Sequence, residues 1–185
     1  MFMVNDMAFE TILVIIIISC LVLIWYLNTY NKFQAFIIRI NEAEANIDSV
    51  LRKRYDLLSK ASKVIEEDTK EENVLTQIKE MKSSNLSNFE VDRIVKDGLN
   101  EFSIYKEKYP KLKDNELFLK TDIELINSES EIISLKKYYN DIITDYNKYA
   151  RVFPSCLVAF ISRYKQRTYF DGKDMNDKNI KDFKI

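Results

Sequence analysis

An uninterrupted apolar run near the start of the chain limits its possible folds more than any other feature of the sequence. The seventeen residues Thr11–Leu27 contain no charged side chain. As a helix that rises ~1.5 Å per residue, they would span roughly 25 Å, close to the thickness of a bilayer's hydrocarbon core. Extending the run toward the N-terminus adds a single charge, Glu10. We therefore predict one transmembrane helix over residues 8–27, preceded by a short extracytoplasmic segment of residues 1–7.

Two other interpretations of the run, a buried core helix and a cleaved signal peptide, fit the sequence less well. Core helices of soluble proteins rarely extend this far without a charge. A signal peptide needs basic residues before its apolar stretch and small residues at its cleavage site. Here the run follows Asp6 and Glu10 and ends with the aromatic residues Trp25 and Tyr26. Aromatic residues at this boundary are typical of a membrane interface, so we predict an uncleaved anchor that inserts into the bilayer.

The distribution of lysine and arginine indicates how this anchor is oriented. No basic residue precedes the apolar run, whereas Lys32 and Arg39 follow it. Cytoplasmic segments next to a transmembrane helix carry an excess of Lys and Arg. The sequence therefore predicts a single-pass protein of the cell membrane, with its N-terminus outside and its helical domain in the cytoplasm.

Composition argues against several classes of function. The chain has only two Gly and two Pro residues, which β-sandwiches, barrels and glycine-rich nucleotide-binding folds need in larger numbers. It has no His, the residue that Ser-His-Asp triads and most zinc sites require. Cys20 and Cys156 lack the spacing of a paired motif, and a net charge of −1 is unlike that of a nucleic-acid binder. We assign no catalytic, cofactor-binding or metal-binding residue, and we expect no cofactor, nucleic acid or small-molecule substrate.

Apolar residues recur at helical spacing beyond the anchor. One seam steps by four and three positions without a break, and a second row beside it repeats every seven. Three apolar positions per heptad are typical of a bundle helix. No Gly or Pro occurs between Tyr30 and Glu72, so we expect the helix to leave the membrane directly and to extend to about Thr69. The seam contains Phe33, Ile37, Ile40, Glu44, Ile47, Leu51, Arg54, Leu58, Ala61 and Ile65, and the row contains Phe36, Ala43, Val50, Leu57 and Val64.

The middle of the chain is predicted to form two shorter helices. The first covers about residues 71–82 and ends at a polar break, residues 83–85. The pattern Ser87-x-x-Glu90 then predicts a capping box that starts the second helix. Pro110 ends this helix, because the residue before a proline disfavours the helical conformation.

A third long helix is predicted to begin at Asp114 or Asn115, since either side chain could cap it. After it, Pro154 is expected to start a short fourth helix. The seam of the long helix contains Phe118, Thr121, Leu125, Ser128, Ile132, Leu135, Tyr139, Ile142, Tyr146, Tyr149 and Phe153. The apolar positions of the fourth helix are Leu157, Phe160, Ile161 and Tyr164.

Together these patterns predict an all-α fold: an N-terminal single transmembrane helix followed by an antiparallel bundle of long helices, running up-down-up, with a short fourth helix. The first helix, the two middle pieces together and the third helix each span ~53–55 Å, as neighbours in such a bundle should. We expect the bundle over residues 28–170, with Gly98 as a thin spot in its middle section. Residues 171–185 are rich in charge and are expected to be a disordered tail.

Several short motifs occur in an order that resembles the LemA family. The segment IDSVLRKRYDLL, residues 47–58, is similar to that family's signature segment. The segment YPKLKDNELF, residues 109–118, is similar to its Tyr-Pro-x-Leu-Lys-x-Asn turn. The resemblance covers about residues 30–170. Further matches in family order are Leu125, Glu129, Ile132, Tyr139-Asn140, Tyr146-Asn147, Phe153-Pro154, Ala159 and Tyr169-Phe170.

The resemblance implies a single-pass membrane protein with a cytoplasmic antiparallel helical bundle and no established enzymatic activity, and it supplies no catalytic residue. Some family members work in membrane organisation or lie alongside membrane proteases, which is an analogy at the level of the fold. The chain departs from the family in two places. The segment Leu58-Ser59-Lys60-Ala61 lacks the usual proline, so we expect a straighter first helix. The His-Glu pair that is frequent in the family is absent, and Glu66-Glu67 lies near its position.

The basic cluster Arg52-Lys53-Arg54 allows a binding role or a structural one. It could bind anionic lipid headgroups or a phosphorylated partner. However, Arg54 falls on the seam, where an unpaired charge would be costly. We therefore favour a structural role in salt bridges, with Glu44 and Glu129 as the candidate partners of Arg54.

Two further polar groups also allow both interpretations. The pairs Tyr139-Asn140 and Tyr146-Asn147 share a helix face and could form a polar groove for a ligand, but we favour hydrogen bonds across helices. The acidic residues Glu66-Glu67-Asp68 and Glu71-Glu72 could attract a cation. Without histidine, a solvated helix face or bend is the favoured interpretation.

Three functional hypotheses follow. The leading one is a non-enzymatic interaction or scaffold module that the bilayer holds through residues 8–27, with other membrane-associated proteins or a second copy of the chain as partners. The alternative is a membrane-linked sensor or signal transmitter that works through a continuous first helix. An enzyme is the least favoured, because no nucleophile–base pair or cofactor motif is visible.

Overall fold

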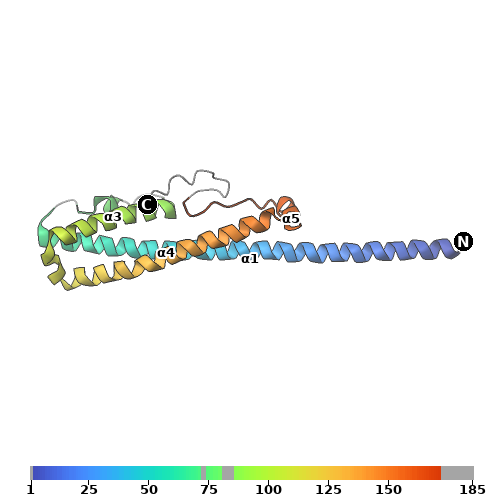
Figure 1. Ribbon diagram of the computed structural model, residues 1–185, viewed down its shortest axis with the longest axis horizontal. Helices are drawn as coiled ribbons and strands as arrows, with labels where there is room; N and C mark the ends of the chain where they lie inside the picture. Colours follow the sequence, from blue (N-terminus) through green and yellow to red (C-terminus); the bar gives the residue numbers. More distant parts are fainter. Residues whose placement is uncertain (1, 72–73, 81–85, 172–185) are drawn as a thin grey trace. The chain divides into compact units, whose positions relative to one another are not determined.

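A computed structural model describes residues 2–71, 74–80 and 86–171, and within these residues the chain forms helices and no strands (Figure 1). The all-α prediction is therefore confirmed. The predicted tail, residues 171–185, lies outside the described residues except for Asp171, as does the predicted break at residues 83–85. The helices are α1 (Phe2–Thr69), α2 (Thr76–Glu80), α3 (Asn88–Lys108), the 3-10 helix η2 (Pro110–Asp114), α4 (Glu116–Arg151) and α5 (Ser155–Ile161).

Helix α1 carries the apolar run and continues past it without interruption. Within the described residues it is the one helix long and apolar enough to cross a membrane. Its large apolar side chains from Phe9 to Ile24 are between 46% and 67% exposed. The helix ends at Thr69, as predicted, because Lys70 has a φ of 60° and its N–H donates to the carbonyl oxygen of Glu66 at 2.9 Å. A left-handed residue in this position is a common way to end a helix.

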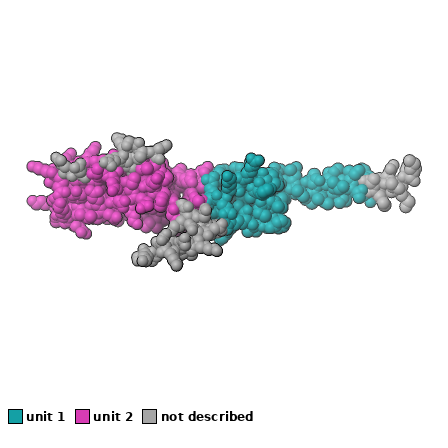
Figure 2. Space-filling view, turned by 90° about the horizontal axis from the view of Figure 1, so that it is seen from above, with its two compact units in different colours: residues 1–39, 144–167 teal, residues 40–143, 168–185 magenta. Residues whose placement is uncertain are grey.

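The chain forms two compact units, coloured differently in Figure 2. Unit 1 consists of residues 1–39 and 144–167, and unit 2 consists of residues 40–143 and 168–185. Helices α1 and α4 each contribute one part to unit 1 and another part to unit 2.

In unit 2, helices α1 and α4 lie side by side and run in opposite directions. The Tyr139 hydroxyl donates to Glu44 Oε1 at 3.2 Å, and further along α1 the Arg54 guanidinium pairs with Glu129. Residue numbers that rise along α1 therefore fall along α4. The two longest helices are therefore antiparallel, whereas the predicted up-down-up order would have made them, as the first and third long helices, parallel.

Helix α3 departs from the predicted up-down-up order, because it runs parallel to α1. At its start, Asn88 Nδ2 donates to the carbonyl oxygen of Glu44 at 3.3 Å, and just after its end the Tyr109 hydroxyl donates to Glu71. The prediction had both middle helices run back along α1, but only the segment before α3 does so. The left-handed turn at Lys70 reverses the chain, so that α2 follows α1 back and α3 then runs forward again (Figure 1).

The predicted helix over residues 71–82 is correspondingly shorter than expected. Among the described residues of that stretch, only Thr76–Glu80 are helical. Ser62 Oγ donates to the carbonyl oxygen of Val74 at 3.2 Å, and the N–H of Leu75 donates to Glu101 Oε1 at 2.9 Å. Side chains of α1 and α3 thus satisfy the backbone groups of the turn that precedes α2.

Most of the predicted seam positions are buried. Phe33, Ile40, Ile47 and Ile65 are fully inaccessible, whereas Phe153, predicted as the last seam position of the third helix, lies beyond the end of α4 and is 75% exposed. The core of unit 2 joins α1, α2, α3, η2 and α4. Its buried residues include Leu57, Leu58, Ala61, Val64, Ile65, Val74, Leu75, Ile78, Val95, Phe102, Leu112, Phe118 and Leu125.

The core of unit 1 is aromatic. The Phe33 ring stacks on Tyr164 with a centroid distance of 4.6 Å and meets the edge of Tyr146 at 5.9 Å. Lys32 Nζ lies 4.5 Å from the centroid of the Tyr149 ring. Aromatic pairs at these separations are stabilising beyond the area that they bury, so these rings hold α1 to the end of α4 and to the segment after α5.

The apolar face predicted for the fourth helix is the wrong one. Pro154 does precede a helix, α5, as predicted. However, Leu157, Phe160 and Ile161 are exposed, and the buried residues of α5 are Ser155, Val158 and Ala159. The smaller side chains of α5 face the rest of unit 1 and let the helix pack closely against it, whereas its largest apolar side chains face outward.

Candidate functional site: a cleft at the end of α1

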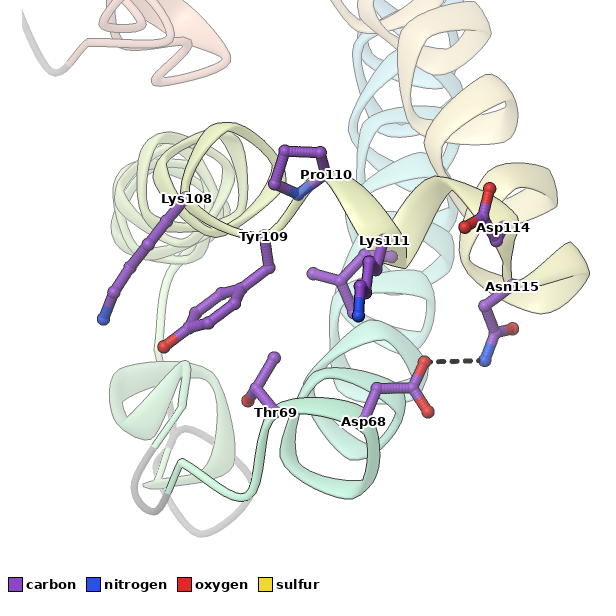
Figure 3. A pocket seen from close by; sticks show the side chains of 9 residues that line it. Asp68, Thr69, Lys108, Tyr109, Pro110, Lys111, Asp114 and Asn115 are labelled. Atoms are coloured by element: carbon purple, nitrogen blue, oxygen red, sulfur yellow. Dashed lines mark hydrogen bonds between the residues drawn. The ribbon is translucent and has the colours of Figure 1, made fainter.

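A cleft of about 730 Å³ opens in unit 2 where α1 ends and α3 gives way to α4 (Figure 3). Three segments supply its walls: the last residues of α1, the end of α3, and the turn that contains η2. It coincides with the Tyr-Pro-x-Leu-Lys-x-Asn turn noted in the sequence. The lining residues are Asp68, Thr69, Lys108, Tyr109, Pro110, Lys111, Leu112, Asp114 and Asn115.

Local sequence rules build this turn. Pro110 is the first residue of η2 and follows Tyr109, the residue after the end of α3, and Leu112 is buried in the core of unit 2. Asn115 then caps α4, because its Oδ1 accepts from the N–H groups of Leu117 and Phe118 at 3.0 and 3.3 Å. Of the two caps predicted for this helix, Asn115 is the correct one. Its amide Nδ2 also donates to Asp68 Oδ2 at 3.0 Å, which ties the start of α4 to the end of α1 (Figure 3).

Charged and phenolic groups meet at one edge of the cleft. Glu71 Oε1 accepts hydrogen bonds from Lys108 Nζ and from the Tyr109 hydroxyl. These bonds, with Lys108 as the larger cause, hold the pKa of Glu71 below its usual 4.5 and raise the pKa of Lys108. Burial, together with Glu71, raises the pKa of the Tyr105 phenol.

These pKa shifts favour the charged forms of Glu71 and Lys108 and the neutral form of Tyr105. The Thr69 hydroxyl donates to the carbonyl oxygen of Ile65 at 2.6 Å, so it is held by backbone rather than by a base. The cleft is therefore suited to holding charged groups in place.

Two residues of the basic cluster, Arg52 and Arg54, form salt bridges, the role favoured for the cluster. Arg54, 3% exposed, pairs with Glu129 of α4, one of its two candidate partners. The other candidate, Glu44, accepts from Tyr139 instead. Arg52 Nε lies 2.7 Å from Asp48 Oδ2, one turn back on α1.

The Tyr-Asn pairs of α4 are hydrogen-bonded, and Tyr139 forms a bond across helices, as predicted, to Glu44 of α1. Their hydrogen bonds include several to the backbone of the segment after α5 rather than to a neighbouring helix. In unit 1, the Tyr146 hydroxyl donates to the carbonyl oxygen of Lys165, and Asn147 both donates to and accepts from the backbone of Arg167. In unit 2, Asn140 Oδ1 accepts from the N–H of Phe170 at 2.9 Å. These side chains hold an extended segment along α4.

The acidic residues at the end of α1 are engaged by basic and amide groups. Glu66 pairs with Lys79, Asp68 accepts from Asn115, and Glu71 accepts from Lys108. Within the described residues, no group of three or more metal-ligating side chains converges. Glu72 lies outside the described residues.

A second candidate surface was missed in the sequence, although its signal is present there. Helix α4 exposes Leu119, Ile123, Ile126 and Ile133, which are between 44% and 61% solvent-accessible. Their spacings of four, three and seven place them on one helix face, as the a and d positions of a coiled-coil seam are placed. The stronger seam through Phe118 accounted for the apolar pattern of this helix, so the weaker one beside it was overlooked.

Comparison with known protein families identifies a matching family model. The model of the LemA family matches residues 43–182, about three quarters of the chain. The matched region includes the cleft, the salt bridge between Arg54 and Glu129, and the exposed face of α4. No curated protein sequence matches the chain.

Proposed function

The chain belongs to the LemA family, and on that premise we propose that it is a non-enzymatic interaction module held at the membrane by residues 8–27. Its partner is a membrane-associated protein, or a second copy of the chain, that packs an amphipathic helix against the exposed face of α4. The observation that carries this proposal is that exposed face, formed by Leu119, Ile123, Ile126 and Ile133.

The apolar part of α1 supports attachment to a membrane. Water-exposed apolar side chains over a whole helical segment are unfavourable in solution, whereas they suit a lipid environment. The side chains of α1 from Phe9 to Ile24 are exposed in this way. Trp25 and Tyr26, which are partly buried, follow at the end of the segment, where aromatic residues favour the headgroup region.

The apolar face of α4 supports a protein partner. Its four residues follow the narrow spacing by which two helices pack as a coiled coil. Ser130 and Lys137 occupy the remaining positions of that seam, which would set the register of a partner at some cost in affinity. An isolated apolar residue on a surface needs no explanation, but an ordered stripe of them marks an interaction site.

Photo-crosslinking in native membranes tests this proposal. A photoreactive amino acid at Ile123 is expected to give a discrete crosslinked product, which Ile126→Lys abolishes because it buries a charge in the contact. Glu131→Lys is the matched control, since it adds a positive charge to another exposed face of α4. A product that survives Ile126→Lys, or no product at all, would contradict the proposal.

Orientation is part of the proposal. The basic residues Lys32 and Arg39 support a cytoplasmic location for the helical domain in the cell membrane. Protease added to intact cells is then expected to leave residues 28–171 whole. Digestion of these residues would reverse the orientation.

A sensor or signal transmitter is the second candidate, because α1 passes from its apolar segment into unit 2 as one uninterrupted helix. Asn31→Pro separates the two candidates, since proline interrupts a helix interior. An interaction module keeps its crosslinked product at Ile123 in this variant. A signal transmitter loses its output, whatever the product.

A further inference from the structure

The short helix α5 and the turn before it expose a compact cluster of large apolar side chains. Phe160 is 86% exposed and Phe153 is 75% exposed, and both belong to unit 1. The opposite side of α5 is buried against the protein through Ser155, Val158 and Ala159. The other exposed apolar residues of this cluster are Val152, Leu157 and Ile161.

Contacts within unit 1 place this cluster beside the end of the apolar segment of α1. Ser162, the residue after α5, shares a hydrogen bond of 3.2 Å with the Tyr26 hydroxyl. Two residues later, the Tyr164 ring lies 6.0 Å from the Tyr30 ring, and its hydroxyl accepts from Gln34 Nε2 at 2.7 Å. Tyr26 is the next-to-last residue of the uncharged run. Helix α5 is therefore attached to α1 at the level where the run ends (Figure 1).

Charge around the cluster is almost entirely positive. The part of unit 1 that follows the apolar run, residues 28–39 and 144–167, contains seven Lys and Arg residues and a single carboxylate, Asp145. The whole chain, by contrast, has a net charge of −1. Exposed Arg151 and Arg163 lie on either side of the cluster in the sequence. Basic residues next to an apolar face are typical of a helix that lies in the interface of an anionic membrane.

We propose that α5 is a second membrane contact, which inserts Phe153, Phe160 and their exposed apolar neighbours into the headgroup region of an anionic bilayer. This inference rests on the proposed anchoring by residues 8–27. It commits to lipid because α5 is attached to α1 where the uncharged run ends, a segment that the proposed function already places in the membrane, and because its basic surroundings complement anionic headgroups. Unit 1 then has two points of attachment to the bilayer.

Tryptophan quenching by brominated lipids tests the contact in the full chain, reconstituted in vesicles of phosphatidylcholine and phosphatidylglycerol. Trp25 is the one tryptophan, so Trp25→Phe with Phe160→Trp gives a single reporter on α5, and Trp25→Phe with Phe153→Trp gives a second one. The matched control is Trp25→Phe with Ile104→Trp, at an exposed apolar position of α3 in unit 2, outside the proposed contact face of α4. The native chain reports on the anchor itself.

Both α5 reporters are expected to lose about half of their emission, mainly to bromines near the headgroups, as an interfacial helix requires. The control stays bright, and quenching at Phe160→Trp weakens when phosphatidylglycerol is omitted. If native Trp25 is quenched but neither α5 reporter is, the second contact is wrong and the anchor stands. If Trp25 is not quenched either, the anchoring proposal fails as well. Emission that depends on protein density rather than on bromine would assign the cluster to a second copy of the chain, which also overturns the inference.

Discussion

Ile78 of α2 lies so close to Gly98 of α3 that a β-carbon at position 98 would stand 2.8 Å from both Cδ1 and Cγ1 of Ile78. Leu58 Cδ1 of α1 would be 3.3 Å away. Gly98, expected from the sequence to be a thin spot in the apolar stripe, is instead a point of close contact between α1, α2 and α3. The missing side chain is what allows α2 to fold back between α1 and α3.

Gly98→Ala is therefore expected to destabilise unit 2 in spite of alanine's better helix propensity. The propensity gain is ~1 kcal/mol, whereas overpacking of a close-packed contact costs ~1–3 kcal/mol, so we expect a net loss of about 1 kcal/mol. Urea unfolding of the full chain in mild detergent, followed by circular dichroism, measures it. Asn100→Ala on the exposed side of α3 is the control and is expected to stabilise slightly. A Gly98→Ala variant as stable as this control would contradict the packing argument.

The salt bridge between buried Arg54 and exposed Glu129 is expected to respond unequally to loss of either partner. Arg54 is 3% exposed, while the Glu129 side chain is 54% exposed. Glu129→Ala leaves a buried cation without its partner and is expected to cost about 2 kcal/mol, less than a fully buried pair because water reaches the carboxylate end. Arg54→Met replaces the charge with an apolar chain of similar length and is expected to stay within about 1 kcal/mol of the native chain. If Glu129→Ala and Arg54→Met lower the free energy of unfolding by urea equally, the burial of Arg54 does not determine the loss.

Asn115 has two roles that a pair of variants separates. Asn115→Ala removes the cap of α4 and the bond to Asp68, at an expected cost of about 1 kcal/mol. Asn115→Asp keeps an acceptor for the N–H groups of Leu117 and Phe118 but places a second carboxylate beside Asp68. We expect Asn115→Asp to lose less stability than Asn115→Ala. This loss should become smaller at high salt, because salt screens the repulsion between the two carboxylates. Thermal unfolding at low and high ionic strength checks both statements.

The helix ends could be predicted from the sequence because single side chains decide them. Ser87 and Glu90 form the expected capping box, Pro110 follows the end of α3, and Asn115 caps α4. The buried seam was also predictable, because a run of apolar residues at spacings of three and four leaves one face of a helix to pack.

The direction of α3 and the outward face of α5 could not be predicted in the same way. Helical periodicity indicates which residues share a face, but it is the same for a helix that runs up or down. The reversal depends on Lys70, a residue with no special tendency toward its φ of 60°. For α5, periodicity cannot distinguish an apolar face that packs on protein from one that is exposed, as Phe160 is. The cleft likewise depends on Glu71 meeting Tyr109 across a long sequence separation.

The stability of unit 2 is expected to depend on pH through Glu71. Because the pKa of Glu71 is lower in the folded chain than the usual 4.5, its contribution is present above that value and is lost as pH falls through the folded-state pKa. The difference in stability between the native chain and Glu71→Gln should therefore shrink as the pH is lowered below 4.5. Tyr109→Phe removes one of the two hydrogen bonds and should retain part of the pH dependence. Urea unfolding across this pH range tests the sign, and a difference that grows in acid would contradict it.

Ile132 and Ile126 of α4 provide the sharpest comparison between a residue of the core and one of the proposed contact. Ile132 is 1% exposed and Ile126 is 61% exposed, although they lie on the same helix. Ile132→Asp loses apolar burial of roughly 1.5–3 kcal/mol and adds the cost of an unpaired buried carboxyl. Because a whole domain is stable by only about 5–15 kcal/mol, unit 2 should become protease-sensitive and lose helical signal.

Ile126→Asp, in contrast, should change the free energy of unfolding by no more than about 0.5 kcal/mol, as exposed substitutions do. It should nevertheless remove the crosslinked product at Ile123, because a desolvated carboxylate has no partner in a coiled-coil seam. A chain that is folded but captures nothing separates contact from stability, which no core variant can do. If Ile126→Asp instead unfolds unit 2, the exposed face of α4 contributes to the fold of the chain itself, and the partner must bind elsewhere.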